Sequence, residues 1–143
     1  MALIPLDEGQ VVSRTVTVLK AAVSKNVYDN WPGPWKAGHR DSWKKHLVAG
    51  FEEVQLPTGG VRVACQATLV FPTARRRDFQ NYHHPLWYYV ADALVDYGVI
   101  PDDTPEYFSI GANGGITFAV DNRRFVAEDK RKRVVLGIAV QMP

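Results

Sequence analysis

The sequence RRRDFQNYHHPLWYYVADALVDYGVIPDD, residues 75–103, contains the strongest helix signal in the chain and carries charged residues at both of its ends. Pro85 suits the first turn of a helix, and Gly98 is a natural stop after the last turn. Between them the apolar residues recur on one face at helical spacing: Leu86, Val90, Ala93, Leu94 and Tyr97. This spacing predicts a helix over 85–97, preceded by an arginine run with Asp78 and followed by Asp102-Asp103.

The residues upstream predict an irregular leader, a strand and a loop. Met1–Gln10 is expected to be irregular. β-Branched residues concentrate between Val11 and Val23, which is typical of a strand. Two prolines and a glycine interrupt Trp31–Trp35, so we expect a loop there with both tryptophans packed on the core.

A second helix and four further strands complete the expected fold. Apolar residues return at helical spacing after a cap at Asp41 or Ser42, at positions Trp43, Leu47, Val48 and Phe51. Strand patterns follow at Val61–Phe71, Tyr107–Ile110, Gly115–Val120 and Val134–Val140. Asn113-Gly114-Gly115 is expected to form a hairpin turn. The order predicts an α/β (α+β) fold, one small domain spanning 1–143 with a mixed β-sheet and about two main helices.

Composition restricts the class of protein. The chain has 143 residues, enough for one domain with a core and too few for two. Its only cysteine, Cys65, excludes an intramolecular disulfide and a cysteine-rich zinc site. The sequence has no apolar run of membrane-spanning length, and we expect a cytoplasmic protein without a membrane partner or a small-molecule cofactor.

Charge is distributed unevenly although the net charge is only +2. The acidic residues bunch between Asp78 and Glu106, whereas basic residues crowd the C-terminal region: Arg123, Arg124, Lys130, Arg131, Lys132 and Arg133. These cations can form a strip that follows phosphates, or they can keep an exposed edge soluble. Composition alone favours solvated surface charge.

Asp78 and Asp102-Asp103 suggest an oxygen-ligand site for Mg²⁺ if the loop and the far end of the helix converge. The neighbouring Arg75, Arg76 and Arg77 would hold a phosphate beside the metal ion. A simpler reading is that Asp102-Asp103 forms a turn, that Asp78 caps the next element and that the arginines are surface charge.

Residues 75–103 resemble the central block of the RusA-like Holliday junction resolvases. That block has arginines, an Asp-x-Asp-Asn motif, a lysine, Asp-Ala-Leu and a later Asp-Asp pair. Asp78, Asn81, Asp92-Ala93-Leu94 and Asp102-Asp103 match it, and Ser24-Lys25-Asn26 is similar to the family's Pro-Ser-x-Asn segment. The resemblance implies a small homodimeric endonuclease of bacterial or phage-infected cells. Such enzymes use Mg²⁺ to cut four-way DNA junctions in recombination and repair.

The chain departs from the family's pattern at the metal site. Gln80 stands where the family has its second aspartate, and a neutral amide binds a hard dication less strongly than a carboxylate does. The family's lysine position holds His84 when counted from Asn81, or Tyr88 when counted from Asp92. The two counts differ because the segment carries extra residues, close to one helical turn of about 3.6 residues.

The resemblance implies a role for each candidate site residue. The expected catalytic residues are Asp78, Asp103 and His84. The expected ligands of Mg²⁺, or of Mn²⁺, are Asp78, Gln80, Asp102 and Asp103. The expected DNA-binding residues are Arg75, Arg76, Arg77, Lys25, Asn26, Lys44 and Lys45. Asn81 and Asp92 are expected to support the site rather than touch the substrate.

Three functions remain open at this point. The first is a resolvase-type endonuclease, and the second is a branched-DNA-binding protein of the same fold with weak or lost cleavage, which Gln80 favours. The third is a structural protein without a DNA role. A homodimer would present two sites to a two-fold junction, and its expected interface is the apolar stripe of the Pro85 helix or the cluster Trp87-Tyr88-Tyr89.

Overall fold

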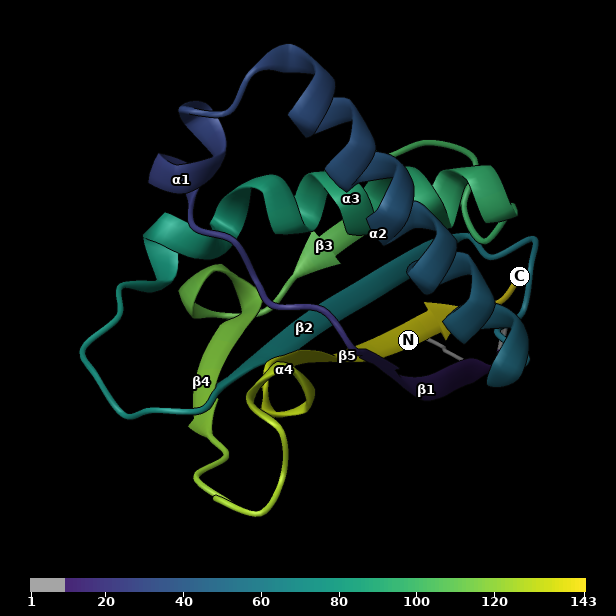
Figure 1. Cartoon of the computed structure of the whole chain (residues 1–143). Helices are drawn as coiled ribbons and strands as arrows, with labels where there is room; N and C mark the ends of the chain where they lie inside the picture. The colour runs from purple at the N-terminus through teal and green to yellow at the C-terminus, as the bar shows by residue number, and fades with distance from the viewer. Residues whose placement is uncertain (1–9) are drawn as a thin grey trace.

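Five strands form one mixed sheet in the computed structural model, which describes residues 10–143 (Figure 1). The expected leader therefore lies outside the described residues, apart from Gln10. The strands are β1 (Val11–Val18), β2 (Arg62–Phe71), β3 (Phe108–Ile110), β4 (Ile116–Val120) and β5 (Arg133–Gln141). β5 lies between β1 and β2 and runs antiparallel to both, whereas β3 and β4 pair with β2 in parallel. The predicted α+β fold with a mixed sheet is confirmed.

Two long helices cover one face of this sheet (Figure 1). They are α2 (Gly33–Glu53) and α3 (His83–Tyr97). Alternation along the strands decides which face they cover, because Val63, Ala67 and Leu69 of β2 are buried while Ala64 and Gln66 are exposed. The helices supply the other half of the core, and six of their buried side chains are Trp43, Leu47, Phe51, Leu86, Val90 and Leu94.

Shorter elements connect these layers. α1 (Lys25–Asp29) precedes α2, and α4 (Glu128–Arg131) precedes β5. Two 3₁₀ turns, η2 (Phe79–Tyr82) and η3 (Asn113–Gly115), lie before α3 and between β3 and β4. None of the helices found in residues 10–143 combines the length and the apolar composition needed to cross a bilayer.

The start of α2 differs from the sequence prediction. The helix begins at Gly33, so Asp41 and Ser42 lie inside it and do not cap it. Pro34 falls in the first turn, where the missing N–H costs no hydrogen bond, so the proline suits the helix instead of interrupting it. Trp35 points outward and is 63% exposed, contrary to the expectation that it packs on the core.

The chain between β3 and β4 is also not the expected hairpin. Both strands run parallel to β2, so they form one interrupted line along its edge. Asn113, Gly114 and Gly115 all have positive φ, which displaces the chain sideways and then lets it resume its direction. The indole N–H of Trp87 donates to the carbonyl of Gly114 at 2.6 Å and fixes this displacement to α3.

Other boundaries follow the sequence closely. Gly98 ends α3 with φ of 86°, as expected for a glycine stop. His84 has extended backbone angles before Pro85, as expected for a residue that precedes proline. The first strand is shorter than expected and ends at Val18 instead of Val23.

Gly115→Ala should destabilise the protein by about 1–3 kcal/mol, because a side chain is strained at positive φ. The added Cβ would lie 2.9 Å from the Trp87 ring and 3.1 Å from Ile110. Urea denaturation followed by tryptophan fluorescence measures the change. Gly38→Ala is the matched control, since nothing lies within 4 Å of its Cβ. Gly38→Ala should stabilise the protein by about 0.5–1 kcal/mol, because alanine favours a helix. Equal effects of the two substitutions would show that position 115 does not require glycine.

Candidate functional site

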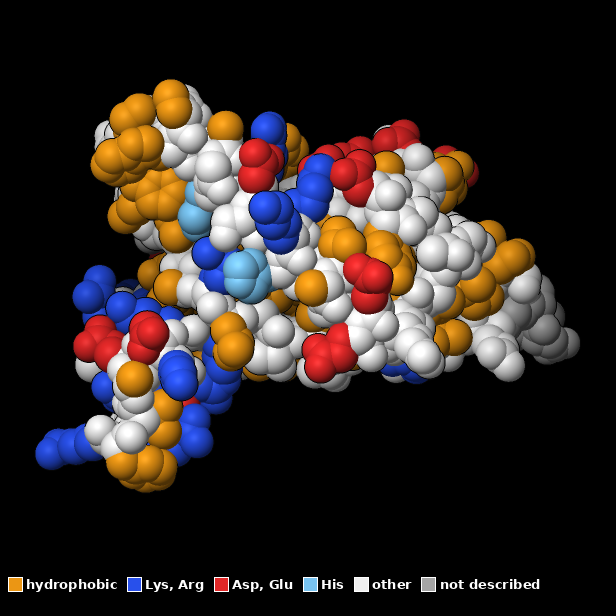
Figure 2. Space-filling view, turned by 45° about the vertical axis from the view of Figure 1, so that its right-hand side comes forward, with side chains coloured by type: hydrophobic (Ala, Val, Ile, Leu, Met, Phe, Trp, Pro, Cys, Tyr) orange, Lys and Arg blue, Asp and Glu red, His pale blue; other side chains and the backbone are white. Residues whose placement is uncertain are grey.

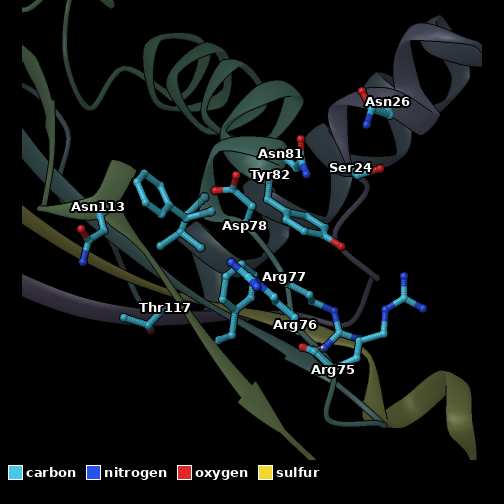
Figure 3. Close-up of a pocket in the computed structure, with 13 residues that line it drawn as sticks. Ser24, Asn26, Arg75, Arg76, Arg77, Asp78, Asn81, Tyr82, Asn113 and Thr117 are labelled. Atoms are coloured by element: carbon cyan, nitrogen blue, oxygen red, sulfur yellow. Dashed lines mark hydrogen bonds between the residues drawn. The ribbon is translucent and has the colours of Figure 1, made fainter.

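A cavity of about 1000 Å³ lies where β2 ends and α3 begins. Arg75, Arg76, Arg77, Asp78 and Asn81 line it from the β2–α3 connection. Figure 3 shows the arginines along one side of the pocket and Asp78 with Asn81 across from them. The arginine run and the carboxylate that precede the predicted helix thus face the same space.

Arg77 organises the connection after β2. Its guanidinium lies over the ring of Phe71, 3.8 Å from the ring centroid. The same group donates to the carbonyl of Thr73 at 3.1 Å. Stacking and hydrogen bonding together occupy Arg77 within the fold and give the loop a defined shape. Arg75 and Arg76 are exposed, so they remain available to a ligand.

Asp78 has a local structural task as well as a place in the pocket. Its Oδ1 accepts a hydrogen bond from the backbone N–H of Gln80 at 3.0 Å, and its carbonyl accepts from the N–H of Asn81 at 3.0 Å. These bonds start the 3₁₀ turn that leads into α3. The expectation that Asp78 can act as a cap is therefore confirmed. The residue is exposed, so the carboxylate also meets solvent and any ligand in the pocket.

Aromatic rings pack behind the polar groups. Phe71 from β2 and Tyr82 from η2 lie 5.6 Å apart between ring centroids, and Tyr82 and Phe118 from β4 also lie 5.6 Å apart. All three rings are held by elements that belong to the sheet or to the start of α3. The pocket consequently has a packed floor, on which the arginine loop rests.

Two segments distant in sequence complete the walls (Figure 3). Ser24 and Asn26 come from the start of α1, where the hydroxyl of Ser24 accepts from the N–H of Val27 at 3.3 Å. Asn113 and Thr117 come from η3 and β4. Sequence reasoning included Asn26 but missed Asn113 and Thr117, because the Asn-Gly-Gly signal indicated only a turn.

Asp102 and Asp103 do not join Asp78 within one chain. They follow the far end of α3, and that helix of 15 residues is about 22 Å long at ~1.5 Å per residue. Oδ1 of Asp102 accepts from the N–H of Asp103 at 2.8 Å, which is ordinary turn geometry. In residues 10–143, no three acidic, histidine or cysteine side chains come close enough to share a metal ion. The expected convergence of these carboxylates inside one chain is therefore wrong.

Gln80 and His84, at which the chain departs from the resolvase pattern, have different surroundings. Gln80 is exposed and donates its backbone N–H to the carboxylate of Asp78, but it is not among the residues that line the pocket. His84 is half-buried and packs edge-on against Tyr28 at 5.1 Å, outside the lining of the pocket. Burial lowers the pKa of His84, which favours the neutral ring near pH 7. The structure does not bring His84 to Asp78, contrary to the expected acid–base role.

Two of the three candidate DNA-binding lysines are already paired. Lys44 on α2 lies 2.9 Å from Asp92 and 2.6 Å from Asp96 on α3. Hydrogen bonds to Asp96 and then Asp92 raise the pKa of Lys44, so this lysine ties the two helices together. Lys25 pairs with Asp29 at 2.5 Å within α1. Lys45 is exposed on α2 but does not line the pocket.

The C-terminal basic residues adjoin the pocket. A second cavity of about 370 Å³ shares Arg75, Arg77 and Tyr82 with it and adds Arg131 and Lys132. In Figure 2, Lys and Arg side chains gather on the lobe at the lower left, at the height where the chain between β4 and α4 projects in Figure 1. Basic side chains of the arginine loop and of the end of α4 thus line one cavity, together with Glu128, which lies 3.3 Å from Lys132.

The sequence matches no model of a known protein family, and no curated protein is significantly similar to it.

Two substitutions at Asp78 distinguish its role as a cap from its negative charge. Asp78→Ala removes the acceptor for the Gln80 N–H and should cost about 0.5–2 kcal/mol of stability. Asp78→Asn keeps a side-chain oxygen in that position and should lower the stability by only a few tenths of a kcal/mol. Urea denaturation of both variants measures the difference. Equal losses would show that the cap does not stabilise the loop.

Proposed function

We propose that this chain is a Mg²⁺-dependent, structure-selective DNA endonuclease that binds and cuts four-way junctions. One observation carries the proposal: three arginines, a carboxylate and polar residues from α1 and β4 line the same cavity of about 1000 Å³. The resemblance of residues 75–103 to the RusA-like resolvases supports the same conclusion.

The arginines supply the affinity for nucleic acid. Guanidinium groups bind phosphate oxygens through paired hydrogen bonds, and Arg75 and Arg76 are exposed beside the pocket. Arg131 and Lys132 line the adjoining cavity, so the protein would be able to contact phosphates of more than one strand. At a branch point, backbones of different strands approach each other more closely than they do along a duplex. Basic side chains around a recess consequently favour branched over linear DNA.

The donor set suits a metal ion that is shared with the substrate. Asp78 offers one carboxylate, and Mg²⁺ in phosphate-processing sites is held by one or two carboxylates together with substrate phosphates. Asp78 would hold the ion, the side-chain oxygen of Gln80 would add a weaker ligand, and Arg75 and Arg76 would fix the phosphate. When bound, Mg²⁺ would activate a water and neutralise the charge of the phosphate.

We further propose that the endonuclease acts as a homodimer in the cytoplasm of a bacterial or phage-infected cell. A two-fold dimer would present two pockets with fixed separation to a junction that is itself two-fold. This arrangement suits paired cuts. It would also allow Asp102 and Asp103 of one copy to approach the pocket of the other, since they lie at the opposite end of α3 from Asp78.

With Mg²⁺ or Mn²⁺, the purified protein should nick a synthetic four-way junction in preference to linear duplex of the same sequence. Asp78→Asn should abolish cleavage and leave binding intact, because it removes the charge and keeps the cap. Arg75→Ala combined with Arg76→Ala should weaken binding and reduce its salt dependence by up to about two phosphate contacts. Denaturing gels and mobility shifts measure the two activities.

The matched control for the arginines is Arg62→Ala. Arg62 is also exposed, but it begins β2 at the opposite end from the pocket. This variant should bind and cut like the wild type. Equal binding of junction and duplex by the wild-type protein would refute a role in branched DNA.

A second function, junction binding without efficient cleavage, is favoured by the neutral Gln80 and by the distance of Asp102 and Asp103 from the pocket. It predicts that the wild type binds junctions and leaves them uncut with either metal. Under this function, Gln80→Asp should raise cleavage, because a second carboxylate would adjoin Asp78. Gln80→Ala is the control for loss of the amide. If both variants behave alike in the denaturing gel, the missing carboxylate is not what limits cleavage.

A further inference from the structure

The chain between β4 and α4 forms a projecting loop with an aromatic residue in its turn. The N–H of Val126 donates to the carbonyl of Arg123 at 3.1 Å, so Arg124 and Phe125 occupy the centre of a β-turn. Phe125 is 87% exposed, more than any other exposed large apolar residue of the described chain. Its ring has no role in the core and directly follows two arginines, Arg123 and Arg124, in sequence.

The base of the loop is tightly held. Asp121 is 6% exposed and accepts from the guanidinium of Arg123 at 2.8 and 2.5 Å. Arg133 of β5 donates to the same carboxylate at 2.8 Å. Hydrogen bonds from Arg123 and then Arg133 hold the pKa of Asp121 well below its usual range, so the carboxylate stays ionised. The exposed turn therefore stands on a defined support.

The same support ties the loop to the pocket. The N–H of Asp121 donates to the carbonyl of Phe71 at 2.8 Å, and Phe71 is the residue on which Arg77 stacks. Arg131, the last residue of α4, and Lys132 after it line the cavity that includes Arg75 and Arg77. DNA held by the arginine pocket would thus extend along a basic surface toward the loop (Figures 1 and 2).

From this placement we propose that Phe125 is a wedge that stacks on a base at the branch point of DNA held in the arginine pocket. The inference rests on the proposed function, since it requires branched DNA in the pocket. Arg123 is fixed by Asp121, whereas Arg124 is free to contact a backbone phosphate beside the inserted ring.

The chemistry of both partners favours this contact. Aromatic side chains stack on bases without regard to sequence, because every base presents a π-face. Apolar wedges enter base steps most easily where stacking is already disturbed, which is the condition at a branch point. A supported turn also loses little conformational freedom on binding, so more of the stacking energy contributes to affinity.

A four-way junction with 2-aminopurine at the branch point tests the wedge. Wild-type protein should raise its fluorescence, because the base leaves its stack, and Phe125→Ala should lose this rise. The variant should bind the junction about tenfold more weakly and duplex unchanged, while Phe125→Trp should behave like the wild type. Trp35→Ala is the matched control, since Trp35 is an exposed aromatic residue outside both basic cavities.

Each other outcome overturns the wedge in a distinguishable way. If the wild type prefers junctions and Phe125→Ala keeps both its fluorescence rise and its affinity, only the wedge is refuted. If Phe125→Ala instead shifts the oligomeric state in sedimentation, Phe125 is a contact between copies of the chain. If the wild type shows no junction preference, both the wedge and the proposed function are overturned.

Discussion

The packing of α3 on β2 is the constraint on which the other features depend. Leu86, Val90 and Leu94 are buried on one side of the helix, and each such side chain contributes about 1.5–3 kcal/mol when it leaves water. Since β2 leads directly into the connection before α3, this burial fixes both ends of residues 72–82. The arginine loop can then adopt only shapes that span the fixed ends. Lys44 adds a polar link between α2 and the outer face of α3, through Asp92 and Asp96.

Within that frame, short-range polar contacts shape the candidate site. Three contacts join a charged side chain to its surroundings. Arg77 stacks on Phe71, and Asp78 accepts from the backbone N–H of Gln80. Asp121 accepts from both Arg123 and Arg133. Each contact uses one charged side chain to hold the structure, and neighbouring charges remain exposed: Arg75, Arg76 and Arg124. The division explains how a run of like charges can be both ordered and available to an anionic ligand.

The sequence predicted the helices and strands better than the contacts between them. Alternation in β2 and the stripe of α3 gave both elements, because burial imposes those periods directly. The start of α2 was missed because proline is both a breaker and a good first-turn residue, and only its position decides which. The pocket residues near Asp78 were largely identified from the sequence, since most of them lie close together along it. The separation of Asp78 from Asp102 could also be predicted from the sequence, because the predicted helix places them about one helix length apart. Asn113 and Thr117 could not have been identified, since their place depends on how β3 and β4 pair with β2.

The interrupted line of β3 and β4 has a consequence for how the protein survives at high concentration. These strands form one border of the sheet, and a long flat border offers free peptide groups to any other extended chain. Here, three successive residues with positive φ break that border into a piece of three residues and a piece of five. Neither piece is long enough to guide the addition of a foreign strand along the whole sheet. The same kink that carries Asn113 to the pocket therefore shortens the edge on which another extended chain could pair with the folded sheet.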